Sequence, residues 1–149
     1  MATTRRLIER VPDDKGQWKP HPKSFSLAHL TQLVATMPGW WIGTLKDDHI
    51  DLATQPGYSN ESTESLLQTF DQLVDQAREA IRTTKDEELD RPWELRMGDQ
   101  VLLSSTKGET ARQHMSHLAH HRGQLTVYLR MLDVPLPSIY GPTADSQSF

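Results

Sequence analysis

Residues 106–133 form the longest helical pattern in the chain, and they constrain the fold more than any other segment. The stretch contains no proline, and Thr106 and Glu109 have the spacing of an N-terminal capping box. A helix of this length rises roughly 40 Å at 1.5 Å per residue. Because such a helix must bury its apolar face against other elements, the pattern predicts further helices packed along it.

Three other segments have helical patterns. In residues 62–83 the apolar positions recur at steps of three and four residues, which predicts an amphipathic helix. Residues 27–37 repeat this pattern until Pro38 and Gly39 break or kink the helix. Residues 3–10 predict a short helix.

The connecting segments are polar or irregular. Residues 46–51 are acidic, and residues 53–60 contain the proline, glycine and asparagine typical of a loop. Residues 86–90 are predicted to be an acidic, solvated connection. Residues 93–105, with Gly98 near their middle, form either a small hairpin or an extended crossover.

We therefore predict an all-α protein, a four-helix bundle with the option of a short extended hairpin before the last helix. Its 149 residues suit one domain, which we place at 1–149. Residues 134–149 begin with alternating prolines and lack periodicity, so they are expected to form an extended C-terminal tail.

The composition argues against several classes of function. Lysine and arginine number 16 against 20 aspartates and glutamates, so no basic surface is expected to hold nucleic acid or an anionic membrane. No apolar run approaches the roughly 20 residues that span a bilayer, and the N-terminus lacks the apolar core of a secretory signal. We expect a cytoplasmic protein. With no cysteine, the chain offers no thiolate nucleophile or ligand.

Histidines gather on the last predicted helix, where four of the seven lie between positions 114 and 121. At 100° per residue, His114, His117 and His121 fall on the stripe that faces the core. His120 lies off this stripe, and Gly123 falls on the opposite, outer face, where another helix or a second subunit can approach closely.

His117 and His121 are one turn apart and point to the same side, an arrangement that can chelate one transition metal. His114 cannot easily join both, because about 10 Å of helix rise separates it from His121. Neutral core histidines bonded to nearby carbonyl or carboxylate groups are the alternative interpretation. The glutamate that follows the first histidine in zinc metalloproteases is missing, which disfavours that class.

The stretch 117–125, HLAHHRGQL, resembles the HxxxHRGQ signature of the DinB/YfiT superfamily. The C-terminal stretch 127–145 and the N-terminal stretch 5–27 resemble one DinB-like branch. This resemblance implies a four-helix bundle with up-down-down-up connectivity, commonly a homodimer. It also implies a divalent metal, zinc or nickel, held by three histidines. Some relatives use such a site for thiol-dependent transfer or hydrolysis of small molecules.

His117 and His121 match two of the three ligands that the resemblance implies. The family's first ligand belongs to a pattern like SLxxLxxHVAxMPGW, and the corresponding stretch here, SLAHLTQLVATMPGW, places Leu33 at that position. His29, one turn earlier on the same predicted face, is the candidate replacement. Without it, the site is reduced to two histidines.

Two kinds of function follow. One is a dimeric binding or stress-response module with a degenerate histidine site. The other is a metal-dependent transferase or hydrolase that acts on a small electrophile with an external thiol. Arg122 and Gln124 either orient the histidine rings or, as we favour, pair with carboxylates on a neighbouring helix. The four tryptophans, at 18, 40, 41 and 93, line a cleft or, more commonly, close the end of a bundle.

Overall fold

The computed structural model describes residues 1–147. Residues 148–149, the end of the predicted tail, lie outside the described residues. The described chain contains six α-helices, three strands and two short 3-10 turns. The helices are α1 (Ala2–Ile8), α2 (Leu27–Thr36), α3 (Pro38–Lys46), α4 (Thr63–Thr83), α5 (Asp86–Leu89) and α6 (Lys107–Met131). The strands are β1 (His49–Asp51), β2 (Pro92–Met97) and β3 (Gln100–Thr106).

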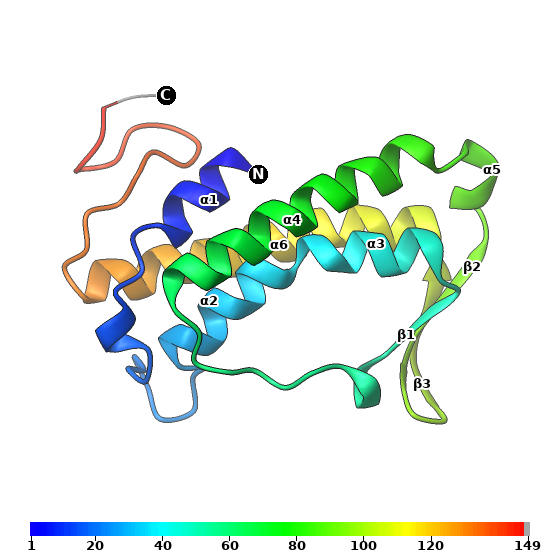
Figure 1. Ribbon diagram of the computed structural model, residues 1–149, viewed down its shortest axis with the longest axis horizontal. Coiled ribbons are helices and arrows are strands. Elements are labelled where there is room, and N and C mark those ends of the chain that lie inside the picture. The colour runs from blue at the N-terminus through cyan, green and yellow to red at the C-terminus, as the bar shows by residue number, and fades with distance from the viewer. Residues whose placement is uncertain (148–149) are drawn as a thin grey trace.

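The longer helices lie along the long axis of the molecule (Figure 1). α2 and α3 follow one another end to end, because Pro38 takes the first position of α3 and Met37 separates the two helices. α4 packs along both, and α6 runs past them in the opposite direction. The core lies where these helices meet, and its fully buried side chains include Leu7, Leu27, Leu30, Val34, Phe70, Leu125 and Leu129.

Both long helices begin at caps that are visible in the sequence. The Ser62 hydroxyl accepts a hydrogen bond from the backbone N–H of Ser65 at the start of α4. At the start of α6, Thr106 and Glu109 form the predicted capping box, in which each side chain accepts from the other residue's backbone N–H. These bonds satisfy donors that the first turn of a helix otherwise leaves free.

A three-stranded sheet covers one end of the helices, in the order β1-β2-β3. β1 runs parallel to β2, with Ile50 opposite Leu95, and β2 runs antiparallel to β3. Gly98 turns the chain between β2 and β3 with a φ of +57°, a left-handed conformation that favours glycine. One oxygen of Asp51 accepts hydrogen bonds from the backbone N–H groups of Gly98 and Ala53, both at 2.9 Å.

The predicted all-α four-helix bundle was therefore wrong: the chain combines six helices with a mixed sheet. The hairpin considered for residues 93–105 is present as β2 and β3, but residues 46–51, predicted as an acidic connection, supply a third strand. Residues 86–90, also predicted as a connection, contain α5. β1 has only one apolar residue among three, so its strand conformation depends on pairing with β2, far along the chain.

The C-terminal segment lies beside α1 and the end of α6 (Figure 1). Asp145 anchors it by pairing with Arg130 and by accepting a hydrogen bond from the backbone N–H of Leu136 at 2.9 Å. Arg6 of α1 donates to the carbonyl of Ser138. Within residues 1–147, none of the helices combines the length and apolar character needed to cross a membrane.

Candidate functional site: the histidine pair and the adjacent groove

His117 and His121 form a close pair on α6. Both are half-buried, and their Nε2 atoms lie 2.9 Å apart, which is hydrogen-bond distance. Because the residues are four apart on one helix, α6 itself places the two rings side by side, with their centroids separated by 4.7 Å. The convergence of these two side chains, predicted from their spacing, is confirmed.

The hydrogen bond from His121 to Gln124 determines which ring nitrogens of the pair carry hydrogens. Nδ1 of His121 lies 2.7 Å from the amide oxygen of Gln124, which can only accept, so Nδ1 carries a hydrogen. In a neutral His121, Nε2 is then the acceptor, and Nε2–H of His117 donates to it. The two Nε2 atoms are therefore donor and acceptor of one hydrogen bond, which needs no metal.

The surroundings favour neutral rings. Burial lowers the pKa of His117, and the neighbouring His121 and His120 lower it further. Burial also lowers the pKa of His121, although the Gln124 hydrogen bond raises it in part. A proton added to Nε2 of His121 would also remove the acceptor from the bond between the two Nε2 atoms.

His114 lies on the same stripe but has a separate environment. Its Nε2 lies 2.9 Å from the hydroxyl of Thr44 on α3. Its ring packs edge to face against Trp40 and Trp41, with centroid distances of 5.7 and 5.4 Å. Burial lowers the pKa of His114 to about 4, with His117 as the smaller cause. His114 is therefore a neutral core residue that joins α6 to α3.

His29 is held in an aromatic stack. Its ring lies between Phe25, at a centroid distance of 4.1 Å, and Tyr58, at 3.8 Å. Burial lowers the pKa of His29, and Lys19 lowers it further. In the part of the chain that the structure describes, no three histidine, aspartate or glutamate side chains come together as a metal site. The structure therefore places His29 in this stack and does not bring it together with His117 and His121.

Leu33 occupies the α2 position at which the resemblance implies the first ligand. It is buried in the core cluster that also contains Leu118 and Leu125 of α6. Trp40 of α3, seven residues after Leu33, packs edge to face against His117, with the two ring centroids 5.4 Å apart. Leu118 and Leu125 lie one residue after His117 and four residues after His121, so the cluster that buries Leu33 includes α6 residues on both sides of His121.

These donors do not fit a three-histidine metal site. Two imidazole nitrogens converge, but the side chain at the third position is aliphatic and buried. Catalytic zinc sites with an open position have three protein ligands. In a tetrahedral site with Zn–N bonds of about 2.0–2.1 Å, two nitrogens lie roughly 3.3 Å apart, so this pair would also have to open by a few tenths of an ångström.

Arg122 and Gln124 have different partners from those that we favoured. Gln124 orients His121, which is the alternative considered for it. Arg122 is buried, donates to the Thr4 hydroxyl at 3.1 Å and to the Tyr140 hydroxyl, and lies over the Tyr140 ring. Within residues 1–147 it forms no ion pair, so the predicted pairing of both residues with carboxylates was wrong.

A groove of about 1180 Å³ lies between α2–α3 and the crossover that follows β1. Trp40 connects the groove to the histidine pair, since it lines the groove and contacts His117. Tyr58 lines the groove from the crossover. A cleft lined by tryptophans was the less favoured interpretation, and Trp40 does line this groove. Its outer wall, residues 52–58, could not be predicted, because the path of this segment depends on contacts with residues far away in the sequence.

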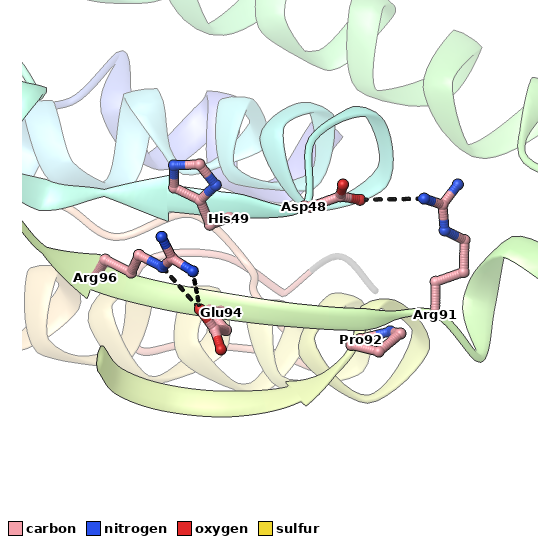
Figure 2. Close-up of a pocket in the computed structure, with 6 residues that line it drawn as sticks. All are labelled: Asp48, His49, Arg91, Pro92, Glu94 and Arg96. Carbon is pink, nitrogen blue, oxygen red and sulfur yellow. Dashed lines mark hydrogen bonds and ion pairs between the residues drawn. The ribbon is translucent and has the colours of Figure 1, made fainter. Parts of the chain in front are cut away.

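A smaller pocket of about 270 Å³ lies at the sheet (Figure 2). Its charged groups neutralise one another: Arg96 pairs with Glu94, and Arg91 lies 3.6 Å from Asp48. The buried ammonium of Lys107 lies 3.5 Å from the same Asp48 oxygen and donates to the carbonyl of Leu45. This arrangement ties β1, β2 and α6 together and leaves little charge to attract a ligand.

Comparisons with known proteins agree on one family. The DinB superfamily model matches residues 1–125. A DinB-like protein from Bacillus subtilis is 20% identical, with a TM-score of 0.69 over 99% of this chain and 92% of its own. A DinB-like protein from Bacillus cereus is 15% identical, with a TM-score of 0.71 over 93% and 89%. At these identities the structures show a shared fold. No curated protein matches the chain.

Proposed function

The chain belongs to the DinB superfamily, and from this premise we propose that it is a small-molecule binding module whose histidine pair has a structural role. The observation that carries the proposal is the 2.9 Å hydrogen bond between the Nε2 atoms of His117 and His121. This bond engages the two nitrogens that a metal would need, while Leu33 supplies no third donor. The groove beside Trp40 is the binding site in this proposal.

The size and lining of the groove support binding. Its volume of about 1180 Å³ exceeds the 300–1,000 Å³ of typical small-molecule sites, so a ligand would fill part of it. Trp40, Ile50 and Tyr58 supply apolar and aromatic surface, and Gln32 and Thr36 supply polar groups. Such sites usually combine an apolar lining with a few polar groups that orient the ligand.

Metal analysis tests the structural role of the pair. Protein purified without a histidine tag is expected to contain much less than one equivalent of zinc or nickel. It should also keep its melting temperature in the presence of a chelator, because no metal contributes to the stability of its fold. His120→Ala serves as the control, since this exposed residue lies off the inward stripe. Stoichiometric metal that is lost in both His117→Ala and His121→Ala contradicts the proposal.

That contrary result would favour the second candidate function, a metal-dependent transferase or hydrolase that acts on a small electrophile. The convergence of the two Nε2 atoms supports this candidate, and Gln124 orients His121 as residues around metal sites commonly do. The remaining ligands would have to come from outside the histidine pair. Any thiol would also be external, because the chain has no cysteine.

We also propose that the module is a homodimer formed through the outer face of α6. Val127 and Met131 are more than half exposed on this helix and lie within about 80° of Gly123 around its axis. A Cβ atom built on Gly123 would meet nothing within 4 Å, so another helix has room to approach there, as expected from the helical wheel. Exposed apolar side chains of this kind are typical of protein interfaces when they form a contiguous patch.

Sedimentation velocity tests the dimer. We expect a mass of two chains for the natural protein and of one chain for Val127→Glu, because the change buries a charge in the proposed interface. Ile81→Glu, a change of the same kind on the exposed part of α4, should leave the dimer intact. A monomeric natural protein, or equal effects of the two substitutions, contradicts this interface.

A further inference from the structure

We propose that the groove binds a small planar aromatic cation, whose ring stacks on Tyr58 near Trp40 and whose charge is held by Asp47 and Asp51. This inference rests on the proposed function, because it names the class of ligand for the same groove. It combines a pre-oriented aromatic surface with an excess of negative charge.

The aromatic surface is fixed before any ligand arrives. Phe25, which precedes α2, stacks on His29 of α2 at an interplanar angle of 19°, and the other face of His29 stacks on Tyr58 of the crossover at 25°. Tyr58 is 47% exposed and lines the groove, so part of its ring remains open to a further partner. Because the stack already holds the plane of Tyr58, a flat ligand would order few additional groups on binding.

The charges around the groove favour a cation. Three carboxylates line it, those of Asp47, Asp48 and Asp51, against one ammonium, that of Lys46. Asp48 is compensated by Arg91 and Lys107.

The other two carboxylates have no such compensation. Within residues 1–147, Asp47 and Asp51 form no ion pair. The N–H groups of Gly98 and Ala53 are the main cause that lowers the pKa of Asp51; His49 and Arg96 lower it further, but Arg96 forms its ion pair with Glu94. The ammonium of Lys46 offsets one of these two charges at most. The groove therefore retains negative charge next to its aromatic lining.

The stack itself does not oppose a cation. Burial lowers the pKa of His29 and raises the pKa of Tyr58, so both rings are uncharged near neutral pH. Trp40 adds a second aromatic surface, and an indole is the best side-chain partner for a cation. A ligand that is both flat and positively charged gains from stacking and from the carboxylates, whereas an anion of the same shape is repelled.

Isothermal titration calorimetry with three matched probes tests this inference. The probes are N-methylquinolinium, a planar aromatic cation; 2-naphthoate, a planar aromatic anion; and cyclohexyltrimethylammonium, a cation without an aromatic ring. We expect N-methylquinolinium to bind at least tenfold more tightly than either of the others, and its affinity to fall as salt increases.

Variants locate the site. Tyr58→Leu is expected to weaken N-methylquinolinium binding at least fivefold, whereas Tyr58→Phe retains the ring and should bind like the natural protein. Asp47→Asn should weaken binding severalfold. Asp75→Asn, on the exposed face of α4, removes the same charge away from the groove and should have no effect. Circular dichroism confirms that each variant is folded.

The outcomes separate the inference from the proposed function. If 2-naphthoate or cyclohexyltrimethylammonium binds as tightly as N-methylquinolinium, and the groove variants weaken that binding, the groove binds small molecules but the ligand class is wrong. If no probe binds, or if the groove variants leave binding unchanged, both the ligand class and the proposed function are overturned.

Discussion

Replacing Leu33 with histidine is expected to tighten zinc binding by about 100-fold. The binding free energy of structural zinc, about 10–16 kcal/mol over four ligands, corresponds to roughly 3 kcal/mol for each ligand, or about a hundredfold in affinity. Leu33 belongs to the core cluster that includes Leu118 and Leu125, which lie on either side of His121 along α6, so we expect a histidine there to approach the point where the two Nε2 atoms converge. Competition with a chromogenic chelator measures the change.

A double variant controls for the added histidine. Leu33→His combined with His121→Ala again has two histidines and should lose the gain in affinity. Leu33 is buried, so circular dichroism and the melting temperature must show that Leu33→His remains folded. A folded Leu33→His protein without any gain in affinity would show that position 33 does not face the pair. The correspondence between Leu33 and the first ligand of the family would then be wrong.

Acid is expected to destabilise the protein through His114. Its pKa is about 4 in the folded protein, against 6.5 for an ordinary histidine, so between these values the unfolded chain binds a proton that the folded protein does not. The free energy of unfolding therefore falls as the pH drops from 6.5 toward 4 and is unaffected by this residue above that range. One pKa unit is worth 1.36 kcal/mol, so the loss approaches about 3 kcal/mol.

Urea unfolding at several pH values, compared with His114→Gln, isolates this contribution. The amide of glutamine can replace the hydrogen bond to Thr44 but does not titrate. His117 and His121 also have lowered pKa values, and their contributions should cancel in the comparison. We expect the difference in stability between the two proteins to shrink as the pH falls. Parallel stability curves would show that His114 is protonated in the folded protein at ordinary pH values.

Features governed by local periodicity could be predicted from the sequence. α4 and α6 follow from their apolar spacing and their caps, and the meeting of His117 and His121 follows from four residues of separation on one helix. Such features depend on residues a few positions apart. Pattern analysis therefore recovers the long helices and the geometry of the pair.

Features that join distant segments could not be predicted in this way. β1 is a strand because β2 supplies its hydrogen bonds, and its charged sequence resembles a loop. The position of His29 on a helical face was compatible with a metal ligand, but Tyr58, from the distant crossover, stacks on its ring. Arg122 resembled a partner for a carboxylate, whereas its partners are the hydroxyls of Thr4 and Tyr140, near opposite ends of the chain.

The carboxylate of Asp51 couples two loops that are far apart in the sequence. Because the same oxygen accepts from Gly98 in the hairpin turn and from Ala53 in the crossover, one anchor holds both segments. Neither strand of the hairpin lines the groove, yet a change in the length of its turn would release the adjoining wall. An insertion at the hairpin tip would therefore reshape the groove without replacing any of the residues that line it.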